Sequence, residues 1–144
     1  MSLVNGMVAG LVAGIIMIVV SEIGYSLKLI KGNLVIIDGS LAWRMMAGKS
    51  QAAGIYILGI LIHLITSLVF GLVYAILARI LEFESRSLMF IAIYVFLLWL
   101  AMLFVALPIA GQGLFGKKVD NKVWLEQLFL HAFFGVAFWW ALGF

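Results

Sequence analysis

The sequence predicts an all-α protein, a four-helix transmembrane bundle with up-down-up-down topology, from two observations. Hydrophobic residues make up 67% of the 144 residues and charged residues only 10%, which leaves too little polar surface for a soluble domain of this length. The apolar residues also fall into four long stretches separated by short charged segments, as in chains that cross a membrane. We therefore expect residues 1–144 to form a single integral membrane domain.

Four predicted spans follow one another along the chain. At about 1.5 Å per residue, each is long enough to cross a hydrocarbon core of about 30 Å. The first span is not a typical signal peptide, because no basic residue precedes it, and we expect it to be retained. The predicted spans are residues 3–27, 53–81, 88–110 and 123–144.

The third predicted span ends in a proline and a run of glycines. Pro108 has no N–H to donate to the carbonyl of Phe104, so we expect a distorted last turn. GQGLFGKK, residues 111–118, matches the G-x-G-x-x-G pattern, but the dinucleotide-binding fingerprint requires a strand before it. We expect these glycines to end the helix and turn the chain.

The basic residues predict the orientation of the spans. Most of them lie in the first and third connections, whereas the second connection has two basic residues offset by two glutamates. The positive-inside rule then places the first and third connections in the cytoplasm and both termini outside. The charged residues are Lys28, Lys31, Arg44 and Lys49 in the first connection, Arg79, Glu82, Glu84 and Arg86 in the second, and Lys117, Lys118 and Lys122 in the third.

The first connection, about residues 28–51, is the longest. Asp38-Gly39 is a turn signal, and Ser40 is a candidate cap for a short helix after it. Such a helix would place Trp43 and Arg44 at the level of the lipid head groups. Two interpretations stay open, an interfacial anchor and a docking surface for a partner subunit.

The only two histidines, His63 and His131, lie inside the second and fourth spans, where ionisable groups are costly and usually functional. Both spans leave the same side of the membrane, so their helices are parallel. At about 1.5 Å per residue, each imidazole is about 12–15 Å from the start of its span. We therefore expect the two side chains at nearly equal depth.

The two histidines also share a pattern of neighbours on their helical faces. At about 100° per residue, each has a small residue one turn on and a phenylalanine two turns on. The candidate cofactor-binding residues are Gly59, His63, Ser67 and Phe70 in the second span and His131, Gly135 and Phe138 in the fourth.

This arrangement predicts a b-type cytochrome, with haem b held between His63 and His131 as axial ligands and electron transfer as the task. Arg44, Lys49 and the Lys117-Lys118 pair are candidate partners for the haem propionates. (Bacterio)chlorophyll is the second candidate cofactor and a bare metal ion the third. The alternative is that each histidine only hydrogen-bonds a neighbouring helix.

Glu22 is the only acidic residue well inside an apolar run. One hypothesis joins it to His63 and His131 in a carboxylate–histidine metal site. Another makes it the proton or cation site of a small transporter, or of a lipophilic-ligand binder. In the third interpretation, Glu22 pairs with Lys28 or reaches water near the interface.

Gly6, Gly10 and Gly14 form a small-residue stripe on the first span, which allows close approach of another helix. That helix belongs either to the same bundle or to another subunit. The second case fits a cofactor-free accessory subunit of a larger respiratory or photosynthetic membrane complex. This is the alternative to the cytochrome function.

Several function classes are disfavoured. The chain has no cysteine, which excludes disulfides, thiolate metal sites and iron–sulfur clusters. No nucleophile–base pair or phosphate-binding motif points to an enzyme. The net charge of +3 is concentrated in short connections beside the spans, which indicates lipid head groups and not nucleic acid as the partner.

The order of features resembles a loose group of small, uncharacterised four-span prokaryotic membrane proteins. The matching segments are GMVAGLVAG at 6–14, His63 with FGLVYAIL at 70–77, LPIAGQGLFG at 107–116 and HAFFG at 131–135. This resemblance implies the four-span architecture in a prokaryotic inner (cytoplasmic) membrane and no particular activity. The position of Glu22 in the first span also resembles that of a glutamate in small multidrug exporters, although the rest of their pattern is missing.

Overall fold

The computed structural model describes residues 1–46 and 52–144, and these residues form helices and turns without any strand. The longer helices are α1 (Leu3–Ser26), α2 (Leu34–Met46), α3 (Ala52–Ile80), α4 (Leu88–Ala101) and α6 (Val123–Ala141). Shorter segments are the π-helical turn Met102–Ala106, α5 (Leu107–Ile109) and the 3₁₀ turn Leu114–Gly116. The predicted all-α class is confirmed.

Three helical segments in the described residues are long and apolar enough to cross a membrane: Leu3–Ser26, Gly54–Ile80 and Leu88–Ile109. They coincide with the first three predicted spans, and they identify the chain as a membrane protein in contact with lipid. The fourth predicted span coincides with α6, but α6 is shorter and carries Glu126, Gln127 and His131. It does not reach the same length and hydropathy.

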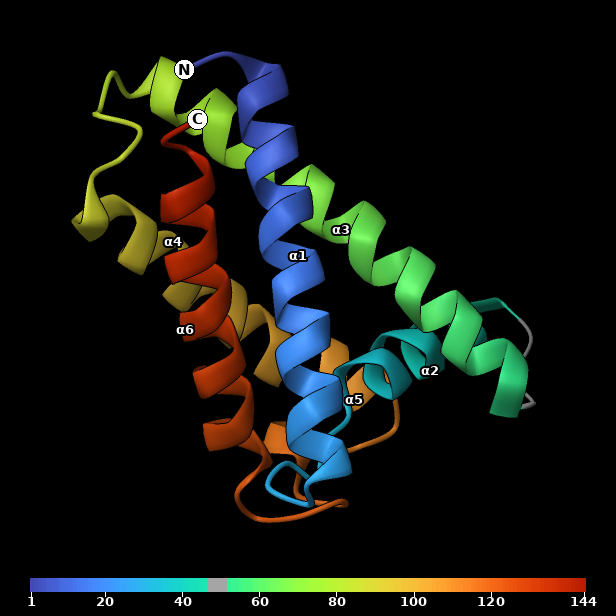
Figure 1. Ribbon diagram of the computed structural model, residues 1–144. Helices are drawn as coiled ribbons and strands as arrows, with labels where there is room; N and C mark the ends of the chain where they lie inside the picture. Colours follow the sequence, from blue (N-terminus) through green and yellow to red (C-terminus); the bar gives the residue numbers. More distant parts are fainter. Residues whose placement is uncertain (47–51) are drawn as a thin grey trace.

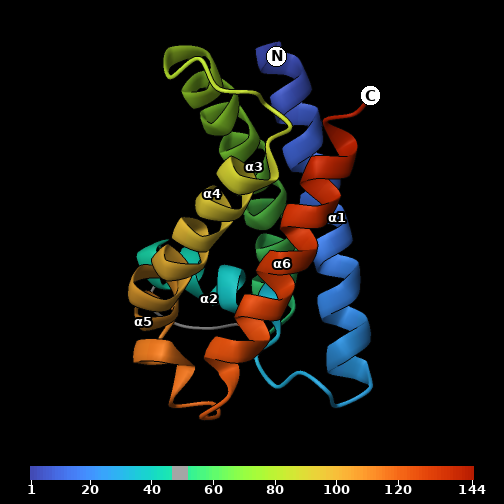
Figure 2. The same ribbon diagram turned by 90° about the vertical axis from the view of Figure 1, so that its left-hand side faces the viewer.

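The helices run in alternating directions, and the two termini lie at the same end of the molecule (Figures 1 and 2). α1 packs against both α3 and α6, and α4 packs against α6. α3 crosses the other helices obliquely, with its first turns far from α6 and its last turns near the termini (Figure 1). α2 packs against α3 in the half of the molecule away from the termini (Figure 1).

α2 corrects two expectations for the first connection. The helix begins at Leu34, so Asp38-Gly39 forms no turn and Ser40 caps no helix. Asn33 is the capping residue instead, because its Oδ1 accepts the N–H of Ile36 at 3.0 Å.

The position of α2 also differs from that of a surface anchor. Leu34, Val35 and Ile37 are buried, with at most 1% of their surface exposed. The free energy gained by burying these apolar side chains inside the protein favours this position of α2 over one at the membrane surface. Lys49 lies outside the described residues.

The glycine stripe of α1 packs within the chain. Gly6 and Gly10 lie against Gly71 of α3, and Gly14 lies against the side chain of Ser67. A Cβ on Gly10 would collide with the carbonyl oxygen of Ser67, so the close crossing of α1 and α3 depends on glycine. The stripe therefore packs against a helix of the same chain, which was the first of its two interpretations.

The end of the third span shows the expected effect of Pro108. The preceding residues Met102–Ala106 are π-helical, and the N–H of Leu107 bonds to the carbonyl of Met102, five residues earlier. Gly111, Gly113 and Gly116 then turn the chain with φ of 82°, 76° and 74°, as glycine allows. The prediction that these glycines end the helix is confirmed.

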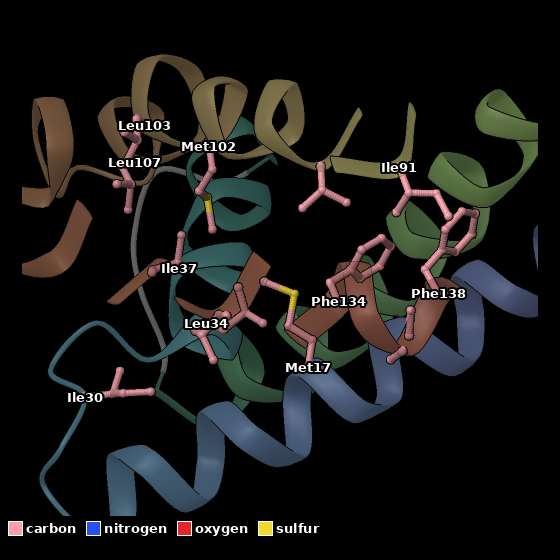
Figure 3. Close-up of a cluster of buried hydrophobic side chains, with 14 of the residues drawn as sticks. Met17, Ile30, Leu34, Ile37, Ile91, Met102, Leu103, Leu107, Phe134 and Phe138 are labelled. Carbon is pink, nitrogen blue, oxygen red and sulfur yellow. The ribbon is translucent and has the colours of Figure 1, made fainter. Parts of the chain in front are cut away.

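The buried apolar core lies along the inner faces of α1, α2, α4 and α6. In Figure 3, Met17, Leu34, Met102 and Phe134, which come from four different segments, point toward a common centre. Ile91 and Phe138 close the core nearer the termini (Figure 3). The same four segments supply part of the wall of a cavity.

Candidate functional site

His63 and His131 line one cavity of about 260 Å³ inside the helical assembly. Both residues are buried, with 7% and 8% of their surface exposed. The cavity wall is mainly apolar and is made by Met17, Leu34, Asp38, Leu41, Ile62, His63, Thr66, Ser67, Phe70, Leu98, Ala101, Met102, Val105, Ala106, His131 and Phe134. The structure therefore brings together two imidazoles that are 68 residues apart in the sequence.

The His63 imidazole is paired with a carboxylate. Its Nδ1 lies 2.8 Å from Oδ2 of Asp38, and both side chains are buried. An ionised carboxylate only accepts hydrogen bonds, so Nδ1 carries the proton and donates it. The other ring nitrogen, Nε2, is buried without a hydrogen-bond partner among the described residues, and the ring lines the cavity.

The His131 imidazole is held in the same tautomer by its own helix. Nδ1 lies 2.8 Å from the backbone carbonyl of Gln127, one turn earlier in α6. A carbonyl oxygen accepts only, so Nδ1 donates and Nε2 keeps its lone pair. Both histidines thus present the nitrogen that usually ligates a metal.

The residues expected to flank a cofactor divide into two groups. Ser67 and Phe70 line the cavity. Gly59, Gly135 and Phe138 are not among the residues that line it. A helix has several neighbours, and spacing along it cannot say which of them a given face meets.

Each of these three residues packs against a protein neighbour. Gly59 lies against the Val35 carbonyl of α2, and Gly135 lies against the side chain of Val95 in α4. The ring of Phe138 is edge-on to that of Tyr74, with 5.1 Å between the centroids. From α6, Phe134 is the aromatic residue that lines the cavity.

Glu22 belongs to a different cluster at the end of α1. It accepts a hydrogen bond of 2.9 Å from Nδ2 of Asn33, the residue that caps α2. Neither the pairing of Glu22 with Lys28 nor a metal site with the two histidines was correct. The described residues contain no group of three His, Cys, Asp or Glu side chains that could hold a metal ion.

Asp38 is a candidate site residue that the sequence did not single out. The signal was present, because Asp38 interrupts the apolar run LVII of residues 34–37. A single acid after such a run marks a buried polar group that needs a partner. Its proximity to glycine favoured a turn instead, and only the packing of α2 against α3 shows that the partner is His63.

The cavity opens toward the side of α3 and α4. Val105 lines it and is 54% exposed, and Thr66 on α3 is half-buried. The cavity therefore has mainly apolar walls, two imidazoles and a side that reaches the surface of the protein.

Comparison of the chain with protein-family models, curated proteins and solved structures finds no match.

Proposed function

We propose that the protein is a small membrane electron-transfer protein in which the Nε2 atoms of His63 and His131 ligate haem b. The observation that carries this proposal is the pair of buried histidines on one cavity, each with Nδ1 already hydrogen-bonded. Metal-ligating histidines typically donate the other ring N–H to a carboxylate or a backbone carbonyl. Asp38 and Gln127 supply one of each.

The donor set favours haem over the other tetrapyrrole. Haem iron takes two axial imidazoles, and a six-coordinate haem transfers electrons without binding a substrate. A (bacterio)chlorophyll magnesium takes one histidine, which would leave the second buried imidazole unused. In donor type alone, the two histidines therefore fit a bis-histidine iron site, and Arg44, Lys117 and Lys118 stay the candidate cations for the propionates.

The absorption spectrum of the purified protein, oxidised and then reduced with dithionite, tests this function. We expect sharp α and β bands after reduction, and their loss in His63→Ala and in His131→Ala. Glu22→Gln is the matched control and should keep the bands, because Glu22 pairs with Asn33 outside the cavity. A colourless wild-type protein that stays colourless after haem is added would refute the proposal.

A second candidate function is the binding of a lipophilic ligand, and the size of the cavity favours it. Pockets for drug-sized ligands occupy about 300–1,000 Å³, so 260 Å³ suits a smaller molecule, whereas a macrocycle requires the helices to spread. The apolar wall and the side facing α3 and α4 agree with a ligand that enters from lipid. Such a ligand would co-purify and be identified by mass spectrometry of the extracted protein.

The hypothesis of an accessory subunit stays a prediction, but the glycines of α1 no longer support it. The glycines of α1 were its strongest sequence feature, and they pack against α3 in this chain. Purification in mild detergent with and without cross-linking would reveal partner subunits. A transporter role centred on Glu22 would show as proton or cation flux that Glu22→Gln abolishes.

The proposed membrane arrangement has four spans, with α6 as the fourth, both termini outside and the basic connections in the cytoplasm of a prokaryote. α6 carries an exposed apolar stripe at three- and four-residue spacing, as a helix with one lipid-facing side does. The residues of this stripe are Leu125, Phe129, Phe133, Val136 and Trp140. This stripe supports a transmembrane position despite the polar residues on the opposite face.

A further inference from the structure

Asp38 is a buried carboxylate, and two histidines could ligate a metal without it. Its side chain is 12% exposed and lies between α2 and α3, where an unpaired charge would be costly. The only partner that the structure describes for it is Nδ1 of His63, at 2.8 Å. The pair is therefore a buried carboxylate–imidazole dyad whose free nitrogen, Nε2, belongs to a ring that lines the cavity.

Asp38 is held in place by the anchored start of α2. The N–H of Leu34 donates to Oγ of Ser21 at 3.2 Å. The N–H groups of Lys31 and Gly32, just before the helix, donate to the Glu126 carboxylate at 3.0 and 2.9 Å. These contacts tie α2 to α1 and α6, so the carboxylate one turn into α2 has a defined position before anything enters the cavity.

The close approach of α2 to α3 is the second condition for the dyad. A Cβ on Gly59 would collide with the carbonyl oxygen of Val35, and one on Gly39 with the carbonyl oxygen of Ile55. These two glycines let the backbones nearly touch on either side of Asp38. Gly59 lies one turn before His63, so it brings the imidazole and the carboxylate within hydrogen-bonding distance.

We infer that Asp38 is a positioning residue that presets His63 in the Nδ1-protonated tautomer in the ligand-free protein, which leaves the lone pair on the buried Nε2 atom. The backbone carbonyl of Gln127 presets His131 in the same way. The inference rests on the proposed function only in naming His63 as a ligand, since the tautomer is a property of the protein alone. Both rings then carry their proton on Nδ1 and their lone pair on Nε2.

Two consequences for the occupant follow from these tautomers. A metal centre accepts both lone pairs, whereas a ligand with carbonyl oxygens alone, such as a quinone, receives no hydrogen bond from either ring. The negative charge of Asp38 also makes His63 the more basic ligand. A more basic axial ligand stabilises the oxidised metal, so Asp38 lowers the reduction potential of a bound haem.

Nitrogen NMR of the ligand-free, ¹⁵N-histidine-labelled protein tests the inference. The chain has two histidines, so each ring is resolved and assigned from His63→Ala and His131→Ala. We expect both wild-type rings to carry the proton on Nδ1. In Asp38→Ala, His63 should shift toward the Nε2-protonated tautomer, because nothing then holds the Nδ1 proton, and the His131 signals should stay unchanged.

Asp38→Asn is the near-isosteric variant that keeps the size of the side chain and removes its charge. An amide can donate from Nδ2 to Nδ1 of His63, whereas a carboxylate accepts, so His63 should lose its exclusive Nδ1-protonated tautomer in Asp38→Asn as it does in Asp38→Ala. A wild-type His63 protonated on Nε2, or His63 signals that ignore Asp38→Ala, would overturn the inference. Preset tautomers in a protein that binds no haem would refute the proposed function alone.

Discussion

At the scale of single residues, the glycines of α1 have a measurable role. Gly10 meets the carbonyl of Ser67 and lies against Gly71, so both contacts are with backbone that cannot move aside. Gly135 is a useful contrast, because its nearest neighbour is Cγ2 of Val95, a side-chain atom that can shift. Two glycines of similar helical setting therefore differ in the neighbour that a methyl group would meet.

We predict that Gly10→Ala destabilises the protein by about 1–3 kcal/mol, the usual cost of overpacking. Gly135→Ala is the matched control and should cost less, since the added Cβ would sit 3.3 Å from Val95 and alanine favours the helix. Denaturant titration in detergent micelles, followed by circular dichroism, measures both. Equal losses in the two variants would contradict the packing that we describe.

At the scale of elements, the position of α2 depends on the polar contacts at its N-terminus more than on the periodicity of its sequence. Asn33 caps the helix through the N–H of Ile36 and also donates to Glu22. The helix carries Asp38, so its stability decides how well His63 is positioned. α1 has a simpler cap, in which Oγ of Ser2 accepts the N–H of Asn5 at 2.9 Å.

Asn33→Ala should lower the stability of α2 by about 1 kcal/mol through loss of the cap. Amide hydrogen exchange should then be faster within Leu34–Met46 and unchanged in the middle of α1. Ser2→Ala removes a cap at an exposed helix end, and we expect faster exchange only in the first turn of α1. If Asn33→Ala left exchange in α2 at its wild-type rate, Asn33 would not be its functional cap.

The connections before α2 and α6 are joined by an ion pair between Lys31 and Asp120. The hydrogen bond from Lys31, followed by that from the N–H of Lys122, lowers the pKa of Asp120 below its usual 3.8. The same hydrogen bond raises the pKa of Lys31 above 10.5. The pair is therefore charged on both sides over the whole physiological range.

The ion pair should contribute fully to the free energy of unfolding above the pKa that Asp120 has in the unfolded chain. This contribution should disappear as the pH falls through the lowered pKa of Asp120 in the folded protein. We expect a small difference in unfolding midpoint between wild type and Asp120→Asn at pH 7, because both groups are near water. That difference should vanish in strong acid and shrink in high salt. A difference that persists at pH 2 would require another cause.

At the scale of the whole molecule, the exposed surface is that of a protein in lipid. Large apolar side chains are exposed along all four long helical segments, among them Val19 on α1, Leu61 on α3, Phe96 on α4 and Phe129 on α6. Water would make such a surface costly, whereas lipid tails do not. The exposed apolar side chains of α6 support the proposed fourth span.

Single-cysteine labelling tests this arrangement, since the chain has no cysteine of its own. With α6 as a span, Asn121→Cys and Phe144→Cys should react with a membrane-impermeant reagent from opposite sides. Glu84→Cys, in the connection between α3 and α4, should react from the same side as Phe144→Cys. Reaction of Asn121→Cys and Phe144→Cys from one side would show that α6 does not cross.

The sequence by itself determined the helices and the environment of this protein. Apolar runs such as residues 3–27 and 53–81 allow little else, because a backbone without water must satisfy its hydrogen bonds within a helix. The end of the third span was equally readable, since Pro108 lacks a donor and glycines permit positive φ. The common placement of His63 and His131 followed from depth and direction along parallel helices.

Only the tertiary structure decided which faces meet. It placed α2 inside the assembly, paired Asp38 with His63, and turned Gly59 and Gly135 toward neighbouring helices. Local spacing says which residues share a face, but packing of side chains from distant segments selects the neighbour of that face. Spacing along the chain therefore predicted that the two histidines lie at similar depth, whereas the pairing of Asp38 with His63 appeared only in the tertiary structure.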